Sequence, residues 1–129
     1  MSDAISAIND SETLIKAYQA GQRNFTNLDL ASAELSGAYL QGADLSYADL
    51  SEANLSGAHL RGTDLSYARL SEANLAQADL RGAMLLGTDL RGANLQDALL
   101  AAADYDPEET HFPTGFDPKA ANMRPDRPA

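Results

Sequence analysis

The chain has 129 residues, no cysteine and a formal net charge of −10 at pH 7. This length suits one folding unit, the lack of cysteine excludes disulfides and thiolate metal sites, and the excess of acid disfavours direct binding to nucleic acid. The first twenty residues contain no apolar stretch of signal-peptide length, so we expect a cytoplasmic protein that does not contact a membrane.

The N-terminal segment, residues 1–22, contains a predicted helix from about residue 10 to residue 20. Asn9 and Glu12 fit a capping box at its start. Its apolar side chains recur at helical spacing, so they would cover the start of the structure that follows: Leu14, Ile15 and Tyr18. We interpret the helix as an end cap, and the alternative is a partner-binding element.

From Leu30 to Leu100 a leucine occupies every fifth position, usually with Ala two residues before it and Asp or Asn directly before it. A period of five fits neither a helix nor a straight strand, because such residues would not share one face. It fits short extended sides joined by corners, with Ala and Leu inward and Asp or Asn outward. The predicted core ladder is Phe25, Leu30, Leu35, Leu40, Leu45, Leu50, Leu55, Leu60, Leu65, Leu70, Leu75, Leu80, Leu85, Leu90, Leu95, Leu100 and Tyr105.

The corners have a sequence signature of their own. At seven corners a glycine stands two residues after the leucine, where a type II turn favours a residue with positive φ. Residues 43–62 match residues 63–82 at fifteen of twenty positions, which indicates four sides per coil. Coils stacked about 4.8 Å apart then give a square β-solenoid of about four coils.

The units ADLSY at residues 43–47 and ANLSG at residues 53–57 resemble the A(D/N)LXX motif of the pentapeptide repeat family, as found in small cyanobacterial members. The resemblance covers residues 23–105. It implies an all-β solenoid, a right-handed quadrilateral β-helix. Most members of the family have no assigned biochemical activity.

Residues 106–129 form a proline-containing tail without a repeat, which we expect to be irregular, partly docked and disordered at its end. Phe112 and Phe116 are predicted either to close the final coil or to pack over the apolar residues that stand at outward positions nearby, Met84, Leu86 and Leu99. A self-association surface is the alternative. We expect a monomer, and a dimer through an end or a ladder face is the other possibility.

Outward residues twenty apart stack into columns, and two groups of columns form the candidate interaction surface. The first group is locally basic and comprises Tyr39, His59, Arg61, Asp79 and Arg81. The second group repeats faithfully between coils and comprises Tyr47, Glu52, Tyr67 and Glu72. Each group also has a purely structural interpretation, as a paired charge ladder or as rings that stabilise the coil.

No catalytic or metal-binding motif accompanies the two histidines, His59 and His111, so we expect no enzyme, no cofactor and no metal. The sequence predicts a non-enzymatic, rigid interaction module that presents ladder faces to an unknown protein partner. The family resemblance offers an alternative, a DNA-mimicking modulator of a type II topoisomerase such as gyrase. The outward arginines and a sealed final coil argue against that alternative.

Overall fold

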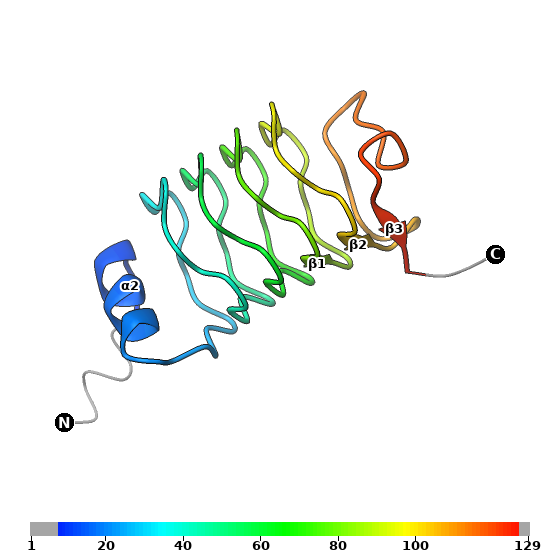
Figure 1. Ribbon diagram of the computed structural model, residues 1–129. Helices are drawn as coiled ribbons and strands as arrows, with labels where there is room; N and C mark the ends of the chain where they lie inside the picture. The colour runs from blue at the N-terminus through cyan, green and yellow to red at the C-terminus, as the bar shows by residue number, and fades with distance from the viewer. Residues whose placement is uncertain (1–7, 127–129) are drawn as a thin grey trace.

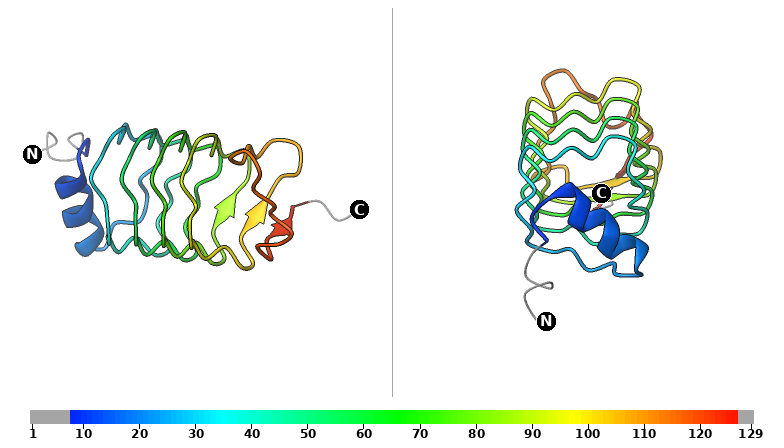
Figure 2. Two further views of the ribbon diagram at one scale, coloured as in Figure 1. Left: turned by 90° about the horizontal axis from the view of Figure 1, so that it is seen from above. Right: turned by 90° about the vertical axis from the view of Figure 1, so that its left-hand side faces the viewer.

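The computed structural model describes residues 8–126, which form a rod (Figure 1). A helix, α2 (Ser11–Gln19), lies across one end. The chain then winds towards the other end, where three two-residue strands pair in parallel: β1 (Met84–Leu85), β2 (Asp104–Tyr105) and β3 (Arg124–Pro125). Figure 2 shows that the coils superpose into a roughly square outline when viewed along the rod.

The pairing register advances by twenty residues in each coil. One column of paired residues runs the length of the rod: Asn24, Asp44, Asp64, Met84, Asp104 and Arg124. The column contains five steps, so the chain makes five coils. Here the structure differs from the sequence prediction, which had about four coils followed by an irregular tail.

The fifth coil, formed by residues 106–126, is irregular in spacing but still follows the solenoid. Asp89 pairs with His111, twenty-two residues later, so two residues are inserted on this side. Regular pairing resumes where the Arg124 N–H donates to the Ala103 carbonyl at 2.8 Å. Met123 takes an inward position and is buried. The repeat was unreadable here because the leucines and the constant spacing are both lost.

The corners have the geometry that the glycines predicted. The Ala38 N–H donates to the Leu35 carbonyl at 3.1 Å, and Gly37 between them has a φ of 68°. The same positive φ occurs at corners without glycine, including Tyr47 at 64° and Glu52 at 60°. The coil therefore imposes this conformation even on residues that tolerate it poorly.

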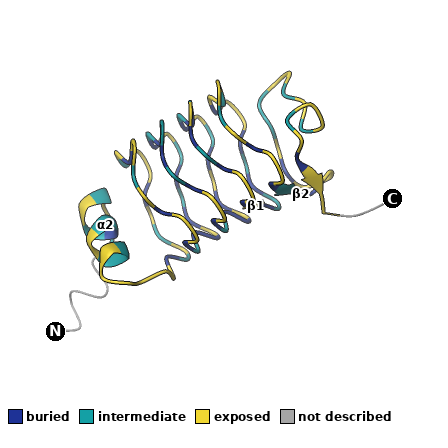
Figure 3. Ribbon diagram, viewed as in Figure 1, coloured by how far each residue is buried: buried dark blue, intermediate teal, exposed yellow. Residues whose placement is uncertain are grey.

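The inward residues form one continuous core along the rod (Figure 3). Every residue of the predicted core ladder is buried except Leu95, which is half-buried. Leu95 lies on a side of the fourth coil that no paired side of the fifth coil covers. The small Ala beside each Leu is also buried through the middle coils, so the two side chains share the inward space.

Helix α2 begins one residue later than the capping box predicted. Its N-cap is Asp10, whose carboxylate accepts the Thr13 N–H at 2.8 Å, so Asn9 does not cap the helix. Leu14 is fully buried against the core, and Ile15 and Tyr18 are partly buried beside it. Within residues 8–126, no helix is long and apolar enough to cross a bilayer.

An aromatic cluster closes the other end of the rod. Phe112 meets Tyr105 edge to face, with ring centroids 5.6 Å apart, and stacks on Phe116 at 5.0 Å. Met84 and Leu99 remain 38% and 48% exposed. The phenylalanines therefore close the final coil and leave these outward apolar residues uncovered.

Candidate functional site

Most outward aspartates and asparagines cap the corner that follows them. The Asn74 side-chain carbonyl, for example, accepts the Ala76 N–H at 3.0 Å. This N–H is the one corner donor that the bonds between coils leave without a backbone acceptor, and a short Asx side chain reaches it. The same bond is made by Asn24, Asp29, Asp44, Asp49, Asn54, Asp64, Asp79, Asp89 and Asn94.

The acidic composition thus follows in large part from corner capping. The sequence analysis did not predict this role. The signal was present, because Asp and Asn alternate freely at the position and only the side-chain oxygen is common to both.

Six outward positions between residues 24 and 99 carry neither Asp nor Asn: Glu34, Tyr39, His59, Arg69, Met84 and Leu99. Three of them, Tyr39, His59 and Leu99, belong to one side of the rod, whose outward column is completed by Asp79. We call this column of four residues the aromatic face. Three of its four residues lack the Asp or Asn side chain that forms the corner cap.

The aromatic face combines stacked rings with positive charge. Tyr39 is 61% exposed and stacks on His59, with ring centroids 4.2 Å apart and planes 6° from parallel. Arg81 donates to both carboxylate oxygens of Asp79 at 2.8 and 2.7 Å. This pairing lowers the pKa of Asp79, and nearby Arg61 lowers it further.

Unlike the side chain of Arg81, the guanidinium of Arg61 has no hydrogen bond or ion pair with any of residues 8–126. It follows His59 by two residues, at the corner beside the aromatic face. A guanidinium without a carboxylate partner is available to an acidic group on another molecule.

In the second predicted group, three of the four residues pack against a neighbouring coil. Tyr47 and Tyr67 stack with centroids 5.2 Å apart, and the Tyr67 ring lies over Gly87. Glu72 likewise lies over Gly92, one coil further on. Glu52, at the corner before Glu72 in the column, is exposed. Contacts within the rod explain the two tyrosines and Glu72, so the aromatic face is the stronger candidate site.

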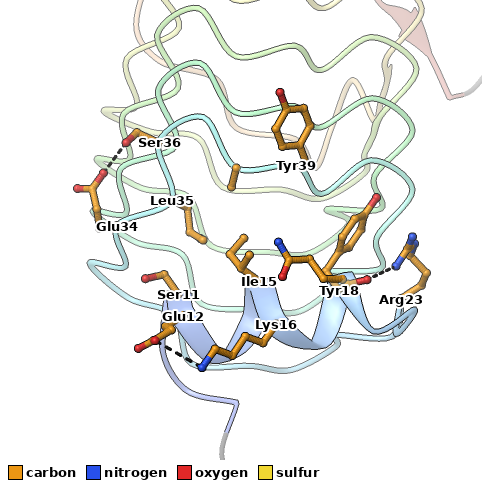
Figure 4. A pocket seen from close by; sticks show the side chains of 12 residues that line it. Ser11, Glu12, Ile15, Lys16, Tyr18, Arg23, Glu34, Leu35, Ser36 and Tyr39 are labelled. Atoms are coloured by element: carbon orange, nitrogen blue, oxygen red, sulfur yellow. Dashed lines mark hydrogen bonds and ion pairs between the residues drawn. The ribbon is translucent and has the colours of Figure 1, made fainter.

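A groove of about 760 Å³ separates α2 from the first coil (Figure 4). Ile15, Leu35 and Ala38 supply its apolar lining, and Tyr18 and Tyr39 flank one end. Tyr39 belongs to both the groove and the aromatic face. Among residues 8–126, no group of three or more histidines and carboxylates is placed to hold a metal ion.

The family model described as "Pentapeptide repeats" matches eight copies over residues 24–62 and 58–97, more than half of the chain. The chain belongs to the pentapeptide repeat family. The resemblance seen in the sequence is therefore confirmed, and with it the coarser fold class, because the family's members are right-handed quadrilateral β-helices.

Solved members of the family include a protein from Nostoc PCC 7120, alr5209, which is 54% identical to this chain with a TM-score of 0.89. That match covers 91% of this chain and 96% of the Nostoc protein. HetL, from the same cyanobacterium and involved in heterocyst differentiation regulation, is 44% identical over 74% of this chain and 46% of its own, with a TM-score of 0.45. Rfr23 from Cyanothece 51142 is 30% identical over 80% of this chain and 64% of its own, with a TM-score of 0.37. No curated protein sequence matches the chain.

Proposed function

We propose that the protein is a non-enzymatic, rigid interaction module and that its aromatic face binds a protein partner. Pentapeptide repeat proteins are generally structural or interaction modules, which supports the first part. The observation that carries the second part is the loss of three corner caps on one face. Each cap contributes about 1 kcal/mol, so side chains that forgo it on a single face indicate a role other than stability.

The chemistry of this face suggests the chemistry of its partner. The stacked Tyr39 and His59 rings offer a flat, preorganised contact area. Leu99 adds a separate exposed apolar side chain on the far side of Asp79 in the column. Arg61 adds an unpaired positive charge within a molecule of net charge −10. A protein segment that combines acidic and aromatic or aliphatic side chains complements this surface.

Substitution of Leu99 tests the proposal, because stability and binding should move in opposite directions. Leu99→Asn restores a cap for the Ala101 N–H and removes an exposed apolar side chain, so we expect the free energy of unfolding to rise by about 0.5–1 kcal/mol. Capture of partners from native extract should become weaker at the same time. Tyr39→Ala and Arg61→Glu should also weaken capture.

A matched control lies on a different face. Asn74→Asp keeps the corner cap and leaves the aromatic face unchanged, so the captured partner should be retained. If Asn74→Asp, Leu99→Asn, Tyr39→Ala and Arg61→Glu all capture the same partner equally well, the aromatic face and the neighbouring Arg61 do not form the binding surface.

Mimicry of duplex DNA, the alternative from the family resemblance, is less well supported. Arg69 interrupts one acidic column between Asp49 and Asp89, and Arg61 adds positive charge beside the aromatic face. Helix α2 and the aromatic cluster also cover the ends through which a longer rod would form. Inhibition or protection of gyrase in a DNA supercoiling assay with the purified protein would favour mimicry instead.

A further inference from the structure

The first coil has an open backbone edge inside the groove beside α2. The N–H groups of Glu34 and Tyr39 and the carbonyls of Glu34, Ser36 and Tyr39 have no hydrogen-bond partner among residues 8–126. In the next coil all five equivalent groups are bonded. The Asn54 and His59 N–H groups donate at 2.9 and 2.8 Å, and the carbonyls of Asn54, Ser56 and His59 accept at 2.7, 2.9 and 2.9 Å.

The second coil shows what kind of segment forms hydrogen bonds with such an edge. The five bonds of the second coil are all made by eight consecutive residues, 33–40. Within this segment the N–H groups of Leu35, Gly37 and Leu40 donate, and the carbonyls of Ala33 and Ala38 accept. An extended segment of about the same length, with a corner residue that tolerates positive φ, therefore matches the open edge of the first coil.

The groove over this edge is suited to a peptide more than to a charged small ligand. Its four charged side chains balance, and each already has an internal contact. Glu12 pairs with Lys16 at 3.6 Å, Glu34 accepts from the Ser36 hydroxyl at 2.7 Å, and Arg23 donates to the Tyr18 carbonyl at 2.9 Å. The groups left unpaired are backbone donors and acceptors above an apolar lining, and the volume of about 760 Å³ lies in the range of binding sites.

A second copy stacked head to tail on the rod does not fit the edge. In the fourth coil the N–H groups of Leu95, Asp97 and Leu100 are also unpaired among residues 8–126, and they would match the first coil of another molecule. The fifth coil of that molecule continues on the other two sides, where His111 and β3 pair with the fourth coil. Those residues would overlap the first coil, so only a separate, slender segment fits.

We propose that the groove between α2 and the first coil binds an extended segment of a partner protein, which adds to the backbone edge at residues 34–39 as a partial coil. This site shares Tyr39 with the aromatic face but is recognised through backbone groups and not through side chains. Leu99→Asn and Arg61→Glu separate the two sites, because neither residue lines the groove. Either site can fail its test without the other.

The probe is an acetylated and amidated peptide with the sequence of residues 33–40, AELSGAYL, added to the full-length protein. Amide hydrogen exchange followed by NMR should slow at least about tenfold at Glu34 and Tyr39 when the peptide is saturating. Exchange at Asn54 and His59 should not change, because their N–H groups already pair with the first coil. The same peptide N-methylated at its third and fifth residues should not protect Glu34 or Tyr39.

Two substitutions of one residue separate backbone from side-chain recognition. Glu34→Ala and Glu34→Pro both lose the hydrogen bonds that the Glu34 carboxylate accepts from Ser36 and Asn54, and only proline also removes the N–H. The free protein does not use this N–H, and an edge strand tolerates proline, as β3 does at Pro125. Peptide affinity should stay within about twofold in Glu34→Ala and fall at least about tenfold in Glu34→Pro.

Several results would overturn the proposal. These are equal affinity for the normal and N-methylated peptides, or no protection of Glu34 and Tyr39 in the wild-type protein at saturating peptide. Slow exchange at both amides before any peptide is added, in a protein that sediments as a dimer, would assign the edge to a second copy instead. The exchange measurement uses the wild-type chain, so it stands even if Glu34→Pro does not fold.

Discussion

At most corners, two residues stabilise the turn: the outward Asp or Asn, whose oxygen caps a free N–H, and the corner residue with positive φ. Glycine takes that φ without strain, whereas a residue with a Cβ loses about 1 kcal/mol or more. Gly87 has an additional requirement, because the Tyr67 ring from the preceding coil occupies the space where a Cβ would stand.

Gly87→Ala should therefore destabilise the protein more than the same change at an open corner. A Cβ at Gly87 would lie 2.5 Å from Cε1 of Tyr67, whereas a Cβ at Gly57 meets nothing within 4 Å. Urea unfolding should show a loss of about 2–3 kcal/mol for Gly87→Ala and about 1 kcal/mol for Gly57→Ala.

The double variant isolates the ring. In a Tyr67→Ala background, the cost of Gly87→Ala should fall to that of Gly57→Ala, because only the backbone strain remains. An unchanged cost in that background would show that the Tyr67 ring is not what restricts Gly87.

At the scale of elements, α2 and the fifth coil each cover the apolar core at one end of the rod. A solenoid exposes apolar side chains at its first and last coils, and these must be covered to keep the molecule from associating. Leu14 of α2 is fully buried, and the Phe112 and Phe116 rings close the far end.

Leu14→Ala should lower the free energy of unfolding by about 2–4 kcal/mol, because it leaves a cavity between α2 and the first coil. Ile15→Ala should cost less, since Ile15 is only partly buried and lines the groove. Denaturant titration of both variants checks the order. Equal losses would mean that α2 packs on the first coil through both residues alike.

Truncation after residue 105 should produce oligomers, because it removes the fifth coil and uncovers Tyr105 together with the edge of the fourth coil. Truncation after residue 126 keeps the fifth coil and should leave a monomer. Light scattering on the size-exclusion peak distinguishes the two. A soluble monomer of residues 1–105 with an unchanged melting temperature would show that the fifth coil is not a cap.

At the scale of the whole molecule, acid should destabilise the rod. Hydrogen bonds from Ser51 lower the pKa of Asp49 below its ordinary value of 3.8, and Arg81 and Arg91 do the same for Asp79 and Asp89. A carboxyl with a lower pKa in the folded state stabilises the fold above its unfolded-state pKa. This stability is lost as the pH falls through the folded-state pKa.

Urea midpoints measured against pH should therefore stay high down to about pH 4 and then fall as these carboxyls are protonated. Asp79→Asn keeps an oxygen for the Arg81 N–H but lacks the charge, so its decline below pH 4 should be shallower. A wild-type midpoint that rises below pH 4 would contradict the assignment of these carboxylates as stabilising.

Many features were readable from the sequence because they depend on residues close together or at fixed intervals. Leucines five apart, glycines at the corners and the match of residues 43–62 with 63–82 predicted the solenoid, its four sides and the family. The helix signal before the repeats was readable too, although Asp10 caps it and not Asn9. The fifth coil was not readable, because a two-residue insertion before His111 breaks the interval.

By itself, the sequence determined the repeating unit, the inward ladder and the column to which each outward residue belongs, since all three follow from periodicity. Only the tertiary structure decided which backbone groups stay unpaired. Glu34 and Tyr39 carry the same kind of N–H as Asn54 and His59, and they differ only in having α2 and a groove, not another coil, beside them. Pairing between coils joins residues about twenty positions apart, so its interruption at an end depends on how the ends fold and pack.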